Sequence, residues 1–145
     1  MSDQTAIPTD EQWGDVGGDL DLHRSFSRFS GKDVEAVLPL FRANPIEGVF
    51  DLQFVPDAIF DYYVAAVMHL LTPPEGRGET DLASAFLQVL RYRAKENPSS
   101  TARTWAQVEP IVTFLSNNQG YYAADPAIFG SFAEIASQIR SLLAK

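Results

Sequence analysis

The sequence lacks cysteine, contains only two histidines and has far fewer basic than acidic residues. Its 145 residues include 11 Lys or Arg and 19 Asp or Glu, so the formal net charge is −8. Without cysteine there is no disulfide, no thiol nucleophile and no zinc site of the Cys type. The shortage of basic residues argues against a nucleic-acid partner, because binding to phosphates requires a basic surface.

The sequence also lacks the segments that direct a chain to or across a membrane. It begins Met1-Ser2-Asp3-Gln4-Thr5, with neither the basic start nor the apolar stretch of a secretory signal. The longest nearly apolar run covers residues 62–71 and is interrupted by His69, which is too short to span a bilayer. We therefore expect a cytoplasmic protein with no membrane partner.

Familiar catalytic and cofactor motifs are missing. No Gly-x-Ser-x-Gly stretch is present, and Gly76-Arg77-Gly78 lacks the rest of a nucleotide-binding fingerprint. Asp57 and Asp61 share a helix face and two carboxylates can bind a divalent cation, but the matching Glu-x-x-His pairs are absent. We predict no catalytic residue, no metal and no cofactor. Carboxylates that meet only in space are invisible in a sequence, so a pocket or an enzyme between helices remains an alternative.

What the sequence has in abundance is helical periodicity. It predicts an all-α, single-domain bundle of five or six helices, with residues 1–18 as a tail or extended lead-in and 19–145 as the domain. The segment 57–71 is apolar on almost every side, so it should be the central helix. The other helices are expected at 19–29, from a Ser30 cap to Asn44, at 81–95, at 101–117, and from Asp125-Pro126 onward.

Three details complete this prediction. Trp13 stands alone in a polar lead-in and should dock onto the body. Residues 45–55 are expected to cross the molecule in an extended conformation, because a lone strand would leave its hydrogen bonds unsatisfied. Pro39 and Pro110 lie inside predicted helices, so each indicates a kink, or for Pro39 a helix that begins later.

The net charge is concentrated in the first part of the chain. Residues 1–61 hold twelve acidic and four basic residues, whereas residues 62–145 hold seven of each. This asymmetry fits either a solvated acidic surface or a negative face that attracts a basic partner. Tyr beside carboxylates is typical of protein-binding surfaces, although an apolar helix can equally bury its Tyr rings. The predicted partner-binding residues are Asp33, Glu35, Glu47, Asp51, Asp57, Asp61, Tyr62 and Tyr121.

One stretch resembles a pattern in small uncharacterised bacterial helical proteins. The pattern comprises Phe29-Ser30-Gly31-Lys32, Phe41 and Asn44, then Asp51-Leu52-Gln53-Phe54-Val55-Pro56, and finally Phe60 and Tyr62-Tyr63. The similarity covers residues 29–63, and its motifs consist of capping and packing residues. Small acidic helical proteins of this kind also resemble the immunity proteins of bacterial toxin systems. The resemblance implies an all-helical fold and no catalytic residues.

These observations lead to one expected function and one alternative. The leading hypothesis is a bacterial immunity protein that neutralises a cytoplasm-acting toxin by direct binding through an acidic face. The alternative is a helical adaptor or housekeeping domain without catalytic activity, whose acidity only provides solubility. A homodimer is compatible with either.

Overall fold

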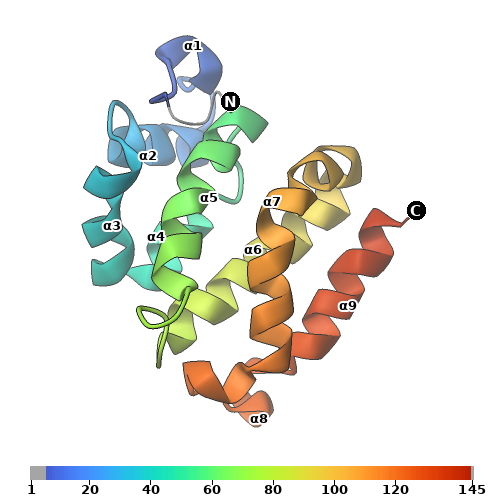
Figure 1. Ribbon diagram of the computed structural model, residues 1–145. Coiled ribbons are helices and arrows are strands. Elements are labelled where there is room, and N and C mark those ends of the chain that lie inside the picture. The colour runs from blue at the N-terminus through green and yellow to red at the C-terminus, as the bar shows by residue number, and fades with distance from the viewer. Residues whose placement is uncertain (1–5, 145) are drawn as a thin grey trace.

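A computed structural model describes residues 6–144, and these residues contain helices but no β-strand. The predicted all-α class is therefore confirmed (Figure 1). The helical segments are α1 (Asp10–Trp13), α2 (Leu20–Phe29), α3 (Val34–Ala43), α4 (Pro45–Phe50), α5 (Asp57–Leu71), α6 (Thr80–Glu96), α7 (Pro98–Asn117), the 3₁₀ helix η2 (Gln119–Tyr122), α8 (Pro126–Phe129) and α9 (Phe132–Leu143).

The helices pack as two groups that meet at the middle of the molecule. In Figure 1, α1 to α5 occupy one side, α7 to α9 occupy the other, and α6 runs diagonally between them. Helix α3 packs on α4 and α5, whereas α6 packs on α4, α7 and α9, and α5 also contacts α6 and α7. The two groups are thus joined by α4, α5 and α6.

The predicted helix 57–71 is present with those bounds, and nine of its 15 residues are buried. Burying a large apolar side chain contributes roughly 1.5–3 kcal/mol, so α5 supplies a major part of the core. Helix α6 is just as deeply embedded, with Phe86, Leu87 and Leu90 among its buried side chains. Within residues 6–144, no helix is both long and apolar enough to cross a membrane.

Helix boundaries differ from the prediction where a proline or a cap residue decides them. Ser30 is not the cap of α3, because Asp33 accepts the Ala36 amide hydrogen bond at 2.8 Å and occupies that position. The later start places Pro39 in the second turn. Helix α7 begins at Pro98 and not near 101, since proline suits the first helical position, where its missing N–H is no loss.

Two further predictions about local structure were wrong. Residues 45–50 form α4, with Pro45 at its first position, so the predicted crossing segment is only partly extended. The last predicted helix is broken at Gly130, whose φ of 78° is unfavourable for residues with a side chain. As a result Ile128 lies on the short α8, outside the core, and is 74% exposed.

The lead-in is only partly extended, because it contains the one-turn helix α1. Thr9 and Gln12 form a capping box around this turn. Trp13 is 1% exposed, and its ring lies edge-on to Phe26 with centroids 5.3 Å apart. The expected docking of Trp13 on the body is therefore confirmed.

Two buried tyrosine hydroxyls tie together segments that are distant in the sequence. The Tyr63 hydroxyl lies 2.7 Å from the carbonyl oxygens of both Phe29 and Lys32, at the turn between α2 and α3. Burial raises the pKa of Tyr63 to about 12, so it remains a donor at all ordinary pH values. In the same way the Tyr122 hydroxyl donates to the carbonyl of Leu71, at the end of α5.

We predict that Tyr63→Phe lowers the free energy of unfolding by about 1–3 kcal/mol, because two carbonyl groups, one of them buried, lose their donor. Urea denaturation followed by circular dichroism measures the change. Tyr62→Phe is the matched control, since this neighbouring tyrosine donates no hydrogen bond to any described residue. Equal losses for the two variants would contradict the role of the Tyr63 hydroxyl.

Candidate functional site

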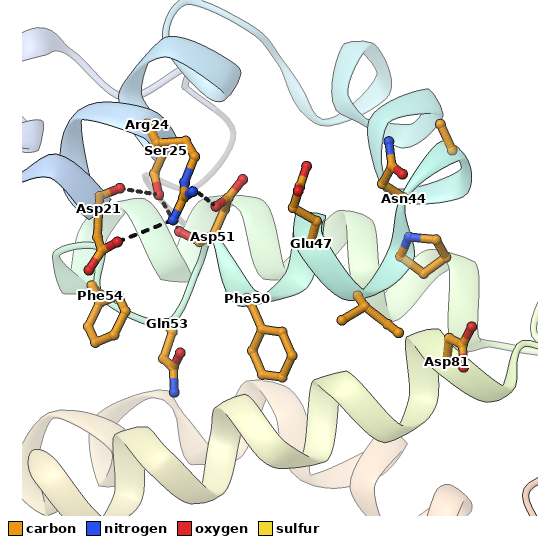
Figure 2. Close-up of a pocket in the computed structure, with 13 residues that line it drawn as sticks. Asp21, Arg24, Ser25, Asn44, Glu47, Phe50, Asp51, Gln53, Phe54 and Asp81 are labelled. Carbon is orange, nitrogen blue, oxygen red and sulfur yellow. Dashed lines mark hydrogen bonds and ion pairs between the residues drawn. The ribbon is translucent and has the colours of Figure 1, made fainter.

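The candidate site is a groove beside α4, which we call the α4–α6 groove. It encloses about 530 Å³ between α2, the α3–α4 junction, α4 and the first turn of α6. Figure 2 shows Phe50, Gln53 and Phe54 extending from α4 and the following turn toward α6. The groove combines these apolar side chains with several carboxylates.

The apolar part of the groove is a row of three large side chains that we call the apolar row: Ile46, Phe50 and Phe54. They are 47%, 37% and 45% exposed, and they follow one another at intervals of four residues. The Phe54 ring is held edge-on against Tyr92 of α6, with centroids 5.4 Å apart. Exposed large apolar side chains clustered together, with polar residues around them, are typical of an interaction site.

Around this row lie three exposed carboxylates, which we call the acidic rim: Asp21, Glu47 and Asp81. They come from α2, α4 and α6, so the fold brings together residues that are up to 60 positions apart in the sequence. Arg24 also borders the groove and pairs with Asp21 at 3.2 Å. Glu47 pairs with Arg28 at 2.7 Å. The groove nevertheless has an excess of negative charge, because its lining holds four carboxylates, including the buried Asp51, and these are paired with only two arginines.

Asp51 was predicted to bind a partner, but its carboxylate is engaged inside the protein. It is 6% exposed and pairs with Arg28 at 2.5 Å and with Arg24 at 3.5 Å. Burial raises the pKa of Asp51, and the positive charges of Arg28 and Arg24 oppose that rise. The backbone carbonyl of the same residue accepts the Ser25 hydroxyl at 2.5 Å (Figure 2). Asp51 therefore joins α4 to α2.

Asp57 is likewise engaged by internal partners. It accepts from Arg93 at 3.3 Å, from Arg103 at 3.1 Å and from the Ser100 hydroxyl. Arg93 is 8% exposed, and its guanidinium also donates to the carbonyls of Leu52, Gln53 and Val55 at 3.0–3.2 Å. The Cζ atom of the Arg93 guanidinium lies 4.3 Å from the centre of the Phe60 ring. Asp57 thus supplies a counter-charge to a buried cation.

Asp61 lies one turn further along α5 and faces α7. Its carboxylate accepts the Thr104 hydroxyl at 2.9 Å, and its backbone carbonyl accepts the Gln107 side chain at 3.1 Å. Burial raises the pKa of Asp61, the Thr104 hydrogen bond opposes the rise, and the nearby Asp57 adds to it. Asp61 therefore fastens α5 to α7.

The remaining predicted partner-binding residues are scattered. Asp33 and Glu35 are exposed at the start of α3, outside the α4–α6 groove. Tyr62 is 4% exposed and packs edge-on against Tyr63, so burial in α5 removes its ring from the surface. Tyr121 is half-buried, with the Arg77 guanidinium 4.9 Å from its ring centre. Of the eight predicted residues, only Glu47 and Asp51 line the groove.

The sequence prediction missed the apolar row. Residues 45–55 were expected to be extended, and Ile46, Phe50 and Phe54 were not among the predicted partner-binding residues. The signal that could have identified this row is the spacing of four residues between Ile46, Phe50 and Phe54. That spacing is typical of one face of a helix. The helix at 45–50 was not expected, so Ile46 and Phe50 were not placed on one face, and the tertiary structure places Phe54 beside them from the turn after α4.

Within residues 6–144, no group of three or more His, Cys, Asp or Glu side chains is arranged to hold a metal ion.

Comparison with protein-family models finds no match for this chain. Comparisons with curated proteins and with solved structures likewise find no significant match. The resemblance of residues 29–63 to small bacterial helical proteins therefore stays a prediction.

We predict that Arg93→Met lowers the free energy of unfolding by about 3–5 kcal/mol, because the carbonyls of residues 52, 53 and 55 lose their donor and each unsatisfied buried acceptor costs about 1–3 kcal/mol. Arg103→Met is the matched control. Its side chain is 70% exposed, so losing its pair with Asp57 should cost about 0–1 kcal/mol. Urea denaturation measures both, and similar losses would contradict the anchoring role of Arg93.

We predict that Asp61→Asn becomes more stable relative to the wild type as the pH rises from about 3 to 7. Folding raises the pKa of Asp61, so the folded protein binds that proton more tightly than the unfolded chain. The wild type therefore loses stability as the pH rises past the ordinary value of about 4. Asparagine keeps an acceptor for Thr104 and does not titrate.

Thermal or urea unfolding at several pH values measures this difference. Asp57→Asn is the comparison, and it should be less stable than the wild type at pH 7 because Arg93 loses its counter-charge. An Asp61→Asn variant whose stability relative to the wild type does not change between pH 3 and 7 would contradict the prediction.

Proposed function

We propose that this chain is a non-catalytic binding protein of the immunity type, which neutralises a basic toxin domain inside the bacterial cell by covering it. The observation that carries the proposal is the acidic rim around an exposed apolar row. Apolar side chains at the centre of an interface supply most of the affinity, whereas charges at its edge steer the encounter and select the partner.

The chain's overall charge supports the same proposal. A net charge of −8 attracts a basic domain over a distance of about 10 Å at moderate salt. The active site of a nuclease, which acts on nucleic acid in the cytoplasm, is rich in basic residues because it must hold phosphates. Asp21, Glu47 and Asp81 would pair with such residues in place of the phosphates.

The set of partner-binding residues in this proposal differs from the set predicted from the sequence. Asp51, Asp57 and Asp61 are committed to internal ion pairs and hydrogen bonds, so we do not assign them to the partner. Glu47 pairs with Arg28 at 2.7 Å but is 62% exposed, so it is retained. Asp21 and Asp81 are added because both border the groove with exposed carboxylates. Asp33 and Glu35 lie outside the groove, so in this proposal they contribute only to the long-range electrostatic attraction of a basic partner.

Co-expression in a bacterial host tests the proposal. The probe is the product of the gene next to the one encoding this chain, and we expect that product to stop growth alone and to lose its toxicity when the chain is present. A helical adaptor with the same groove would bind a partner without restoring growth. Failure to bind or to protect would overturn the immunity role.

We predict that the double variant Asp21→Lys/Asp81→Lys associates about tenfold more slowly with that partner at low salt, with the difference shrinking at high salt. Surface plasmon resonance measures the association rate. The control is Glu109→Lys/Glu134→Lys, which changes the net charge equally at exposed positions on α7 and α9. Equal slowing by both variants would show that overall charge matters and the acidic rim does not.

A further inference from the structure

The α4–α6 groove continues along α6 into a second hollow of opposite charge. This hollow encloses about 660 Å³ between the turn after α4, the second half of α6 and the last turns of α9. Phe50 and Gln53 border both hollows. Its charged lining residues are Arg91 and Lys95, and its lining includes no carboxylate.

The positive charge of this second hollow is not neutralised by the neighbouring side chains. Arg91 donates to the amide oxygens of Gln88 and Gln138, each at 2.6 Å, and both acceptors are neutral. Lys95 is exposed. Among the described residues, neither Arg91 nor Lys95 forms an ion pair. Along α6, the surface therefore changes from negative near Asp81 to positive near Lys95.

From this geometry we infer that the continuous groove binds an amphipathic α-helix of a basic partner protein in one orientation. Its apolar face rests on Ile46, Phe50 and Phe54, and Lys or Arg side chains beside that face meet the acidic rim. Its N-terminal end lies near Asp81 and its C-terminal end lies over Arg91 and Lys95. This inference rests on the proposed function, because it describes the element of the partner that the groove receives.

Three observations favour a helix as the occupant. Ile46 and Phe50 lie one turn apart on α4, and Phe54 follows in the turn after that helix. Together they form a short ridge, and ridges of this kind pack into the grooves of another helix. The distance from Asp81 to Lys95 along α6 is about 21 Å, which equals about four helical turns. A helix also carries partial positive charge at its N-terminus and negative charge at its C-terminus, which matches the change of charge along this groove.

Other occupants fit less well. A second copy of this chain also carries a net charge of −8, so long-range repulsion opposes self-association. An extended peptide that adds a strand needs an exposed sheet edge, and no strand occurs in residues 6–144. A basic helix is attracted by the net charge and oriented by the local charges.

The first experiment measures binding of a synthetic helical peptide by fluorescence anisotropy. The peptide has about 16 residues, a span of roughly 24 Å, with leucines at intervals of four, lysines beside them and a free C-terminal carboxylate. Ile46→Ser should weaken its binding about tenfold. Ile128→Ser, which removes the same side chain from an exposed site on α8, should leave binding unchanged. Circular dichroism confirms that both variants fold.

The second experiment tests the orientation with a nitroxide spin label at one end of the peptide. A label at the N-terminus should broaden the NMR amide signals of the residues around Asp81, and a label at the C-terminus should broaden those around Lys95. The reverse pattern, or equal broadening from both ends, would overturn the orientation. A peptide that does not bind, or that binds Ile46→Ser and Ile128→Ser equally well, would overturn the groove itself.

The same two variants separate this inference from the proposed function. If the product of the neighbouring gene binds Ile46→Ser as tightly as it binds Ile128→Ser, the function stands and the groove inference fails. If the peptide binds in the predicted orientation but that gene product does not bind, the groove stands and the immunity role fails. A dimer at working concentration, dissociated by Ile46→Ser in analytical ultracentrifugation, would show that a second copy occupies the groove and would overturn the inference.

Discussion

The buried guanidinium of Arg93 is the contact on which the candidate site depends. It donates to the carbonyls of Leu52, Gln53 and Val55, and so holds the turn that joins α4 to α5 against the side of α6. A turn with three carbonyls pointing inward would be costly without a donor, because unpaired buried acceptors lose their hydration. With Arg93 in place, Phe50 and Phe54 are presented on one side of this turn and the groove has a defined shape.

The carboxylates of the acidic N-terminal part divide into two groups with different physical roles. Asp51 is buried, Asp57 and Asp61 are half-buried, and the three join α4 to α2, α5 to α6 and α5 to α7. Asp21, Glu47 and Asp81 keep their exposure and surround the apolar row. The first group stabilises the scaffold. The second group is exposed to a partner's charges, since Asp81 forms no ion pair with a described residue and the pairs of Asp21 with Arg24 and of Glu47 with Arg28 are solvent-accessible and contribute little stability.

Much of the fold could be predicted from periodicity and capping. The all-α class, the bounds of α5 and the docking of Trp13 were correct, because a nearly uniform apolar helix and a lone aromatic in a polar segment have few alternatives. The short helices α1, α4 and α8 were missed, since one or two turns hold too few residues to establish a period. The site was predicted less well. Of the predicted residues, Glu47 lines the groove with an exposed carboxylate and Tyr62 is buried, whereas Asp81 and the apolar row were not among them.

The sequence by itself determined that the chain is acidic, helical and centred on an apolar segment, because composition and periodicity act locally along the chain. Only the tertiary structure decided which carboxylates are free, because the partners of Asp51, Asp57 and Asp61 lie 23 to 46 residues away. The tertiary structure also moved the centre of the candidate site. Asp81 belongs to the part of the chain with no net charge, yet helix packing places it beside Asp21 and Glu47 at the groove.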